Sequence, residues 1–225
     1  MSSLFSYLIV LHIAGGTAGL ISGSIAASVQ KGNNVHRLSG KIFFFGMLAA
    51  SLSALIISWL PDHHSVFLFA VGGFTFYMIT TGYRIVFLKR AAKLHDKPFT
   101  AIDYLLFLFG LCFGLVLLVM GIDSVIGGNT FGVVPSVFGL VCMNYARMDY
   151  QLISGKEAVK TGWMANHITR MMGAMIASYT AFLVVNVHIQ QQWILWLLPT
   201  VVGSILISKF LKKFAPRKKE PHTQN

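Results

Sequence analysis

The residues best suited to chemistry are histidines and arginines at the ends of long apolar runs. The segment WMANHITRMMG carries His167 and Arg170 one helical turn apart at the start of such a run. Ala174 and Ser178 continue the same helical stripe with small or polar side chains, so this stripe should face other helices rather than lipid. A neutral imidazole can bind a metal or carry a proton, and a guanidinium binds anions. The pair therefore predicts the wall of a ligand pocket.

Other polar residues are expected at the same membrane depth, near the ends of neighbouring helices. They are His36, Arg37, Tyr83, Arg84, Asp103, Asn144, Arg147 and Asp149. If the helices form a compact bundle, these side chains can converge with His167 and Arg170 in one pocket. Each also has a structural explanation. Arginines at helix ends reach the headgroups or pair with carboxylates, and Asp103 fits a capping box with Thr100.

His12 stands apart because it lies inside the first apolar run, toward the opposite end of the helices. An ionisable residue within a membrane span indicates a functional role. The alternative is a neutral imidazole that is hydrogen-bonded to a neighbouring helix, with Asn186 as the expected partner. Further histidines at the rim of this end could complete a second site with His12; they are His63, His64 and His188.

The composition indicates which elements position these residues. Of the 225 residues, 55% are hydrophobic and 11% are charged, and the mean hydropathy is +0.68. A soluble domain has about twice that charged fraction. Apolar runs long enough to cross a bilayer recur along the chain. They predict an all-α, polytopic membrane domain over 1–214 with seven transmembrane helices, at 5–29, 41–60, 65–88, 101–122, 131–149, 166–187 and 193–211.

The net charge of +11 reflects an asymmetry between the two ends of these helices. Every lysine and arginine falls at one end or in the tail, 215–225, which is polar and expected to be disordered. Because such residues stay on the cytoplasmic side during insertion, we expect the N-terminus outside and the C-terminus in the cytoplasm of a bacterial inner membrane. The basic charge then indicates contact with anionic headgroups of the lipid bilayer, not with nucleic acid.

Two further patterns concern helix packing. Gly15, Gly19 and Gly23 have a four-residue spacing that lets helix backbones approach closely, so the first helix should be central and buried. The second and sixth spans both open with His, Arg and Gly, which suggests an internal repeat. Both cysteines, Cys112 and Cys142, lie inside spans and are expected to pack rather than to form a disulfide.

Six segments of the chain carry a family resemblance: LHIAGGTAGLISG, HRLSGKIFFFGML, GYRIVFLKR, PFTAID, NHITRMMGAMIASYTAFLVVN and LWLLPTVVGS. In this order they resemble a bacterial family of multi-pass membrane proteins that is known as a domain of unknown function. The resemblance covers nearly the whole chain and implies a shared seven-helix body. The positions that match its motifs are His12, His36, Arg37, Tyr83, Arg84, Asp103, His167, Arg170 and Asn186. It implies no reaction.

The leading functional hypothesis is a membrane redox protein that binds haem b. Histidines that project into a helical bundle are the usual axial ligands of such a haem, and arginines pair with its propionates. His36 and His167 are the expected ligands of one site, and His12 could serve a second. Residues that would support these sites are Tyr83, Asp103, Asp149 and Asn186.

Two alternatives remain open, and no strong catalytic motif decides between them. A carrier or binding protein for a small anionic molecule or lipid headgroup would use the arginines of the pocket, which are Arg37, Arg84, Arg147 and Arg170. A zinc-dependent membrane hydrolase would need about three ligands and an activated water at one depth. Asp103 or Asp149 would then have to complete the pair of His36 and His167.

Overall fold

Helices make up most of the residues that the structure describes. A computed structural model of the protein describes residues 2–94 and 98–214. Its helices are α1 (Ser2–Ser28), α2 (Asn34–Ile57), α3 (Val66–Leu94), α4 (Ala101–Ile126), the 3-10 turn η1 (Thr130–Gly132), α5 (Val133–Ile153), α6 (Val159–Asn186) and α7 (Trp193–Phe214). Seven of them are long and apolar enough to span a membrane. The all-α prediction is thus confirmed for the described residues, whereas the tail, 215–225, lies outside them.

Two helices begin earlier than the apolar runs predict. α2 starts at Asn34 rather than at residue 41, because the Asn33 side chain caps it and accepts a 2.7 Å hydrogen bond from the His36 backbone N–H. The expectation that His36 and Arg37 precede the helix is therefore wrong, since both lie in its first turn. α6 likewise starts at Val159 rather than at residue 166. An apolar run marks only the part of a helix that lies in the membrane core, whereas the helix itself extends further, to the residue where it begins.

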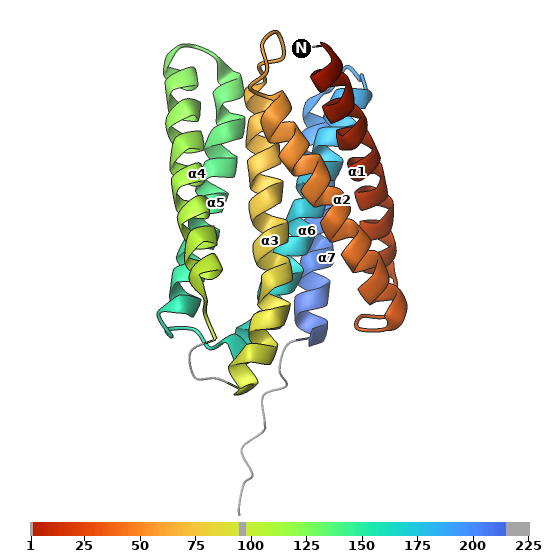
Figure 1. Ribbon diagram of the computed structural model, residues 1–225. Helices are drawn as coiled ribbons and strands as arrows, with labels where there is room; N and C mark the ends of the chain where they lie inside the picture. The colour runs from red at the N-terminus through yellow and green to blue at the C-terminus, as the bar shows by residue number, and fades with distance from the viewer. Residues whose placement is uncertain (1, 95–97, 215–225) are drawn as a thin grey trace, which may run out of the picture.

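α3 lies at the centre of the bundle (Figure 1). It packs against α2 and α6, and the hairpin of α4 and α5 packs against its other side. Tyr77, Met78 and Ile79 of α3 have no exposed surface. On the far side of α2 lies α1, and α7 packs on α6. α3 is therefore the element that can position residues toward both parts of the bundle.

α1 is a peripheral helix, so the central position expected from its glycines is wrong. Tyr7 is 77% exposed and Val10 is 66% exposed. The glycines pack mainly against α2, where a Cβ on Gly15 would lie 2.7 Å from the Gly46 carbonyl oxygen. A stripe of small residues shows that two backbones approach closely, but it does not show how many neighbours the helix has.

The packing does not support the suggested internal repeat. α1 and α2 contact each other along much of their length. α5 and α6, which would be their counterparts, make no comparable contact in the described part of the chain, because α5 pairs with α4 instead. The positions in the helices differ as well, because His36 lies in the first turn of α2 whereas His167 lies well inside α6.

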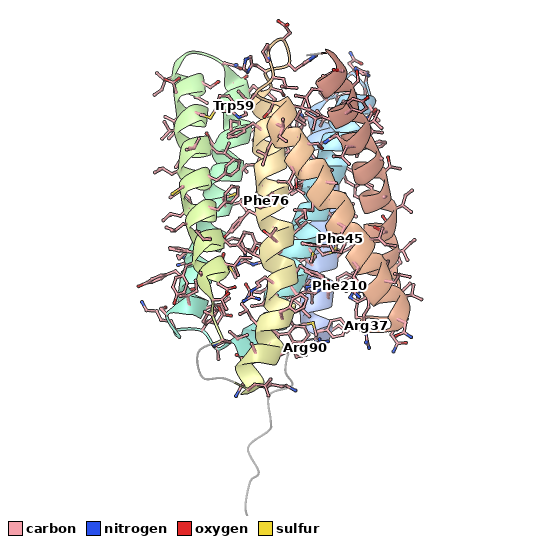
Figure 2. All side chains as sticks on the ribbon, viewed as in Figure 1. Arg37, Phe45, Trp59, Phe76, Arg90 and Phe210 are labelled. Carbon is pink, nitrogen blue, oxygen red and sulfur yellow. The ribbon has the colours of Figure 1, made fainter. Side chains whose placement is uncertain are left out.

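The two ends of the bundle differ in charge (Figure 2). Arg37 and Arg90 lie at one end and Trp59 lies at the other. The end that carries Arg37 and Arg90 is called the basic end below; α1, α3, α5 and α7 end there. The N-terminus lies at the opposite end (Figure 1). The described helices thus keep the charge asymmetry of the sequence.

Candidate functional site

His36 and His167 lie at the basic end, and a backbone carbonyl of a neighbouring helix holds each ring. The Nδ1 atom of His36 on α2 is 3.0 Å from the Ala26 carbonyl oxygen of α1. The Nδ1 atom of His167 on α6 is 2.8 Å from the Gly82 carbonyl oxygen of α3. Because a carbonyl oxygen only accepts, each Nδ1 carries the proton and donates it. His36 lies in the first turn of α2 and His167 lies further along α6, so the two predicted residues belong to different helices that both begin at the basic end.

The Nε2 atoms of this pair are the ones available for chemistry. Among the described residues, none is hydrogen-bonded to Nε2 of His36 or His167. A neutral ring whose Nδ1–H is held by a carbonyl presents its lone pair at Nε2, which is the usual arrangement of an imidazole ligand. Gly40, one turn after His36, faces open space, since a Cβ there would meet nothing within 4 Å. The pair can therefore offer two nitrogen ligands.

Tyr83 contributes an aromatic contact at the same end. Its ring stacks on that of Phe44, with 4.3 Å between the ring centroids, and it meets the edge of Phe87. Phe44 lies two turns after His36 on α2. The stack therefore joins α2 to α3 on the side where the histidine pair lies, and Tyr83 supplies apolar surface there.

His12 shows the same hydrogen-bond pattern toward the opposite end. Its Nδ1 atom is 2.9 Å from the Ala50 carbonyl oxygen of α2. The prediction that Asn186 is the partner of His12 is wrong, because the Asn186 side chain is exposed and its amide donates to the Phe182 carbonyl at 2.8 Å. His63 stacks on Phe5, with 3.8 Å between the ring centroids. His12 therefore has a backbone partner, and among the described residues no second histidine is recorded in contact with it.

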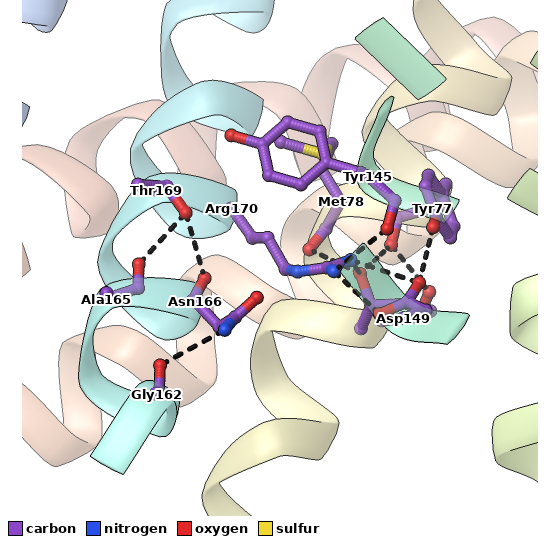
Figure 3. Close-up of polar contacts among 11 residues, drawn as sticks. Tyr77, Met78, Tyr145, Asp149, Gly162, Ala165, Asn166, Thr169 and Arg170 are labelled. Atoms are coloured by element: carbon purple, nitrogen blue, oxygen red, sulfur yellow. Dashed lines mark hydrogen bonds and ion pairs between the residues drawn. The ribbon is translucent and has the colours of Figure 1, made fainter. Parts of the chain in front are cut away.

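Arg170 reaches from α6 to α5 (Figure 3). Its side chain is 1% exposed, and it donates to Asp149 at 2.6 Å and to the Thr81 hydroxyl at 2.7 Å. The Tyr77 hydroxyl donates to the same carboxylate, and the Tyr145 ring centroid lies 5.0 Å from the guanidinium carbon. A buried charge pair persists only when its remaining polar atoms are also satisfied, and this cluster meets that condition.

A second ion pair joins α3 to α4. The Arg84 guanidinium donates to the two oxygens of Asp103 at 2.8 Å and 2.9 Å. Asp103 also accepts from the Thr100 backbone N–H at 2.8 Å, which confirms the predicted capping box. Both ion pairs found among the described residues thus connect the α4–α5 hairpin to the rest of the bundle.

A cavity of about 30 Å³ lies between these two ion pairs. It is lined by Arg84, Asp103, Asp149 and Arg170 together with Thr81 and apolar side chains. A cavity of this size holds about one or two water molecules, whereas a site for an organic ligand occupies about 300 Å³ or more. Both guanidinium groups already bind carboxylates. An anion could therefore bind here only by displacing an aspartate.

The prediction that all these residues share one pocket is wrong. His36 is hydrogen-bonded to α1 and His167 to α3, whereas the two paired arginines reach the α4–α5 hairpin. Arg37 and Arg147 are exposed, and Arg37 donates to the Gly32 carbonyl at 2.9 Å. Depth in the membrane gives the level of a side chain along a helix, but not its direction around the helix axis.

Sequence reasoning missed Tyr77 and Thr81, which complete the Arg170 cluster. Both precede Arg84 on one helical stripe of α3, and this spacing was the signal that could have revealed them. Asn166 was missed as well. Its side chain is 1% exposed, and its Oδ1 atom has no hydrogen-bond partner in the described part of the chain.

The described residues contain no group of three or more histidine, cysteine, aspartate or glutamate side chains that could hold a metal ion. Asp103 and Asp149, the expected third ligands, are each bound to an arginine and do not lie with the histidine pair. The ligand set that a zinc-dependent hydrolase requires therefore does not gather in this part of the chain.

Comparison with family models, curated proteins and solved structures gave no match. The resemblance to the bacterial membrane-protein family therefore stays a prediction. The functional argument depends on the geometry of the side chains alone.

Proposed function

We propose that this is a membrane redox protein that binds haem b through His36 and His167. The observation that carries the proposal is that both histidines have their Nδ1–H held by a backbone carbonyl while Nε2 has no described partner. Haem ligation uses this nitrogen and this tautomer. Both histidines lie on helices that begin at the basic end, which supports their acting as one pair.

The surroundings of the pair fit such a group in chemical type. Gly40 leaves open space one turn from His36, and the stack of Tyr83 on Phe44 supplies apolar surface. Arg37 is exposed directly after His36, and its guanidinium can pair with a propionate. When bound, a haem supplies one-electron transfer. His36 and His167 would hold it, and their Nδ1–carbonyl bonds would set the basicity of the ligand nitrogens.

We further propose that the chain lies in a bacterial inner membrane with its basic end in the cytoplasm. Lysine and arginine residues are retained on that side during insertion, and the described ones gather at one end of the helices. The N-terminus would then lie outside and α7 would end in the cytoplasm. The histidine pair would face the cytoplasmic half of the membrane.

The proposal is tested by loading the purified protein with haem b and recording its visible spectrum and iron content. We expect stoichiometric iron and a six-coordinate, low-spin spectrum. His36→Ala and His167→Ala should each convert the spectrum to a five-coordinate form or abolish binding. His188→Ala is the matched control, because this histidine is exposed at the opposite end, and it should bind like the wild type.

Folding is checked in each variant by helical circular dichroism and size-exclusion chromatography, so that lost binding is not confused with lost structure. The proposal is wrong if the wild-type protein takes up no haem, or if both histidine variants keep the six-coordinate spectrum. Stoichiometric zinc in the protein as isolated, with no haem uptake, would instead favour a hydrolase.

A further inference from the structure

A shallow, open hollow lies on the exposed face of α7 near the basic end, outside the histidine pair and the ion-pair cavity. It is lined by Ser204, Ile205, Ser208, Lys209 and Lys212. These positions follow one another at helical spacing over the last turns of α7, so they form one stripe. Two hydroxyl groups and two ammonium groups therefore face the same hollow.

These polar groups have no partner in the described part of the chain. Most serines in the described helices, such as Ser22, donate to a carbonyl of their own helix, but no hydrogen bond from Ser204 or Ser208 to a described residue is recorded. The two lysines are also unpaired there, because both ion pairs among the described residues are made by arginines. The hollow thus presents unused donors and positive charge.

An apolar strip runs along α7 from this hollow toward the opposite end. Its side chains are each about half exposed, and they are Leu197, Leu198, Val201, Val202 and Ile205. In a membrane such a strip faces the acyl chains of lipids. A ligand that filled the hollow could therefore extend its apolar part along the same helix.

Further lysines lie at the same end of α7 but outside the hollow. Lys31 lies over the Phe210 ring of α7, with 4.5 Å between its Nζ atom and the ring centroid. Burial, and secondarily the nearby charge of Lys213, lower the pKa of Lys31 below its usual value. Position 210 faces away from the stripe of Ser204, Ser208 and Lys212, so Lys31 adds positive charge to the basic end as a whole.

We propose that this hollow on α7 binds the headgroup phosphate of an anionic phospholipid, whose acyl chains follow the apolar strip. The lysines at positions 209 and 212 attract the phosphate, and the hydroxyl groups of Ser204 and Ser208 donate to its oxygens. The combination of charge with a continuous apolar strip selects a lipid over a free anion. This site does not depend on the proposed haem.

The test is native mass spectrometry of the full, delipidated chain in detergent, titrated with phosphatidylglycerol or with phosphatidylcholine. We expect preferential retention of phosphatidylglycerol. The double variant Lys209→Gln/Lys212→Gln should weaken its binding by about ten-fold or more, since each lysine near an anionic headgroup contributes about a five-fold factor. Ser204→Ala/Ser208→Ala should weaken it less while leaving the charge unchanged.

The matched control is Lys93→Gln/Lys156→Gln, which removes the same charge from the same end outside the hollow and should bind like the wild type. The proposal is overturned if this control loses as much affinity, because attraction would then be diffuse. It is also overturned if phosphatidylcholine binds equally tightly, or if inorganic phosphate at millimolar concentration displaces the lipid.

Discussion

At the scale of single residues, the two ion pairs differ in how deeply the arginine is buried. The Arg170 side chain is 1% exposed, whereas that of Arg84 is 27% exposed. Removing one partner of a buried pair leaves the other charge uncompensated, while water can screen an exposed one. The Arg170 cluster is therefore the more sensitive of the two.

We predict that Asp149→Asn lowers the free energy of unfolding by about 3–5 kcal/mol, because it leaves the buried Arg170 without a counter-charge. The double variant Asp149→Leu/Arg170→Met should recover much of this loss, since it removes both charges. The measurement is denaturant unfolding in detergent. Arg147→Met is the control, and because this arginine is exposed its effect should stay within about 0.5 kcal/mol. Additive losses in the double variant would contradict the assignment.

At the scale of helices, apolar runs and capping residues carried most of the predictive information. The seven runs correspond to the helices of the described part, and the Thr100–Asp103 capping box is confirmed. Neighbours were harder to predict, because the direction of a side chain around a helix axis depends on which helices meet. His167 and Arg170 are one turn apart and both bind α3, at Gly82 and Thr81, yet only Arg170 also reaches Asp149 of α5. The spacing of residues along a helix cannot predict which neighbouring helices a side chain contacts.

The contact of α1 with α2 gives a prediction about two adjacent glycines. A Cβ at position 15 would lie 2.7 Å from the Gly46 carbonyl oxygen, whereas one at position 16 would meet only the Ala50 Cβ, at 4.0 Å. Gly15→Ala should therefore destabilise the protein by about 1–3 kcal/mol by pushing two backbones apart. Gly16→Ala should be neutral or slightly stabilising, because alanine favours helices. Thermal unfolding of both variants in detergent decides this, and equal effects would contradict the close contact.

At the scale of the whole molecule, the orientation in the membrane determines which compartment the histidine pair faces. We predict that, in a background where Cys112 and Cys142 are serine, a cysteine at position 64 (H64C) reacts with an impermeant thiol reagent in intact cells. A cysteine at position 156 (K156C) should react only after permeabilisation. Both positions are exposed and lie at opposite ends. The reverse labelling pattern would place the basic end outside.

His12, His36 and His167 share one structural feature, and this feature has a consequence for genetics. Their acceptors are the backbone carbonyls of Ala26, Ala50 and Gly82, all small residues. No substitution can delete a backbone carbonyl, so a search for loss-of-function alleles would find His36 and His167 without finding a polar side chain that bonds them. At His12 only the Ser53 hydroxyl, 3.5 Å from Nδ1, could appear in such a search. The informative alleles would instead enlarge the small residues, since a bulkier side chain displaces the carbonyl and turns the imidazole away from it.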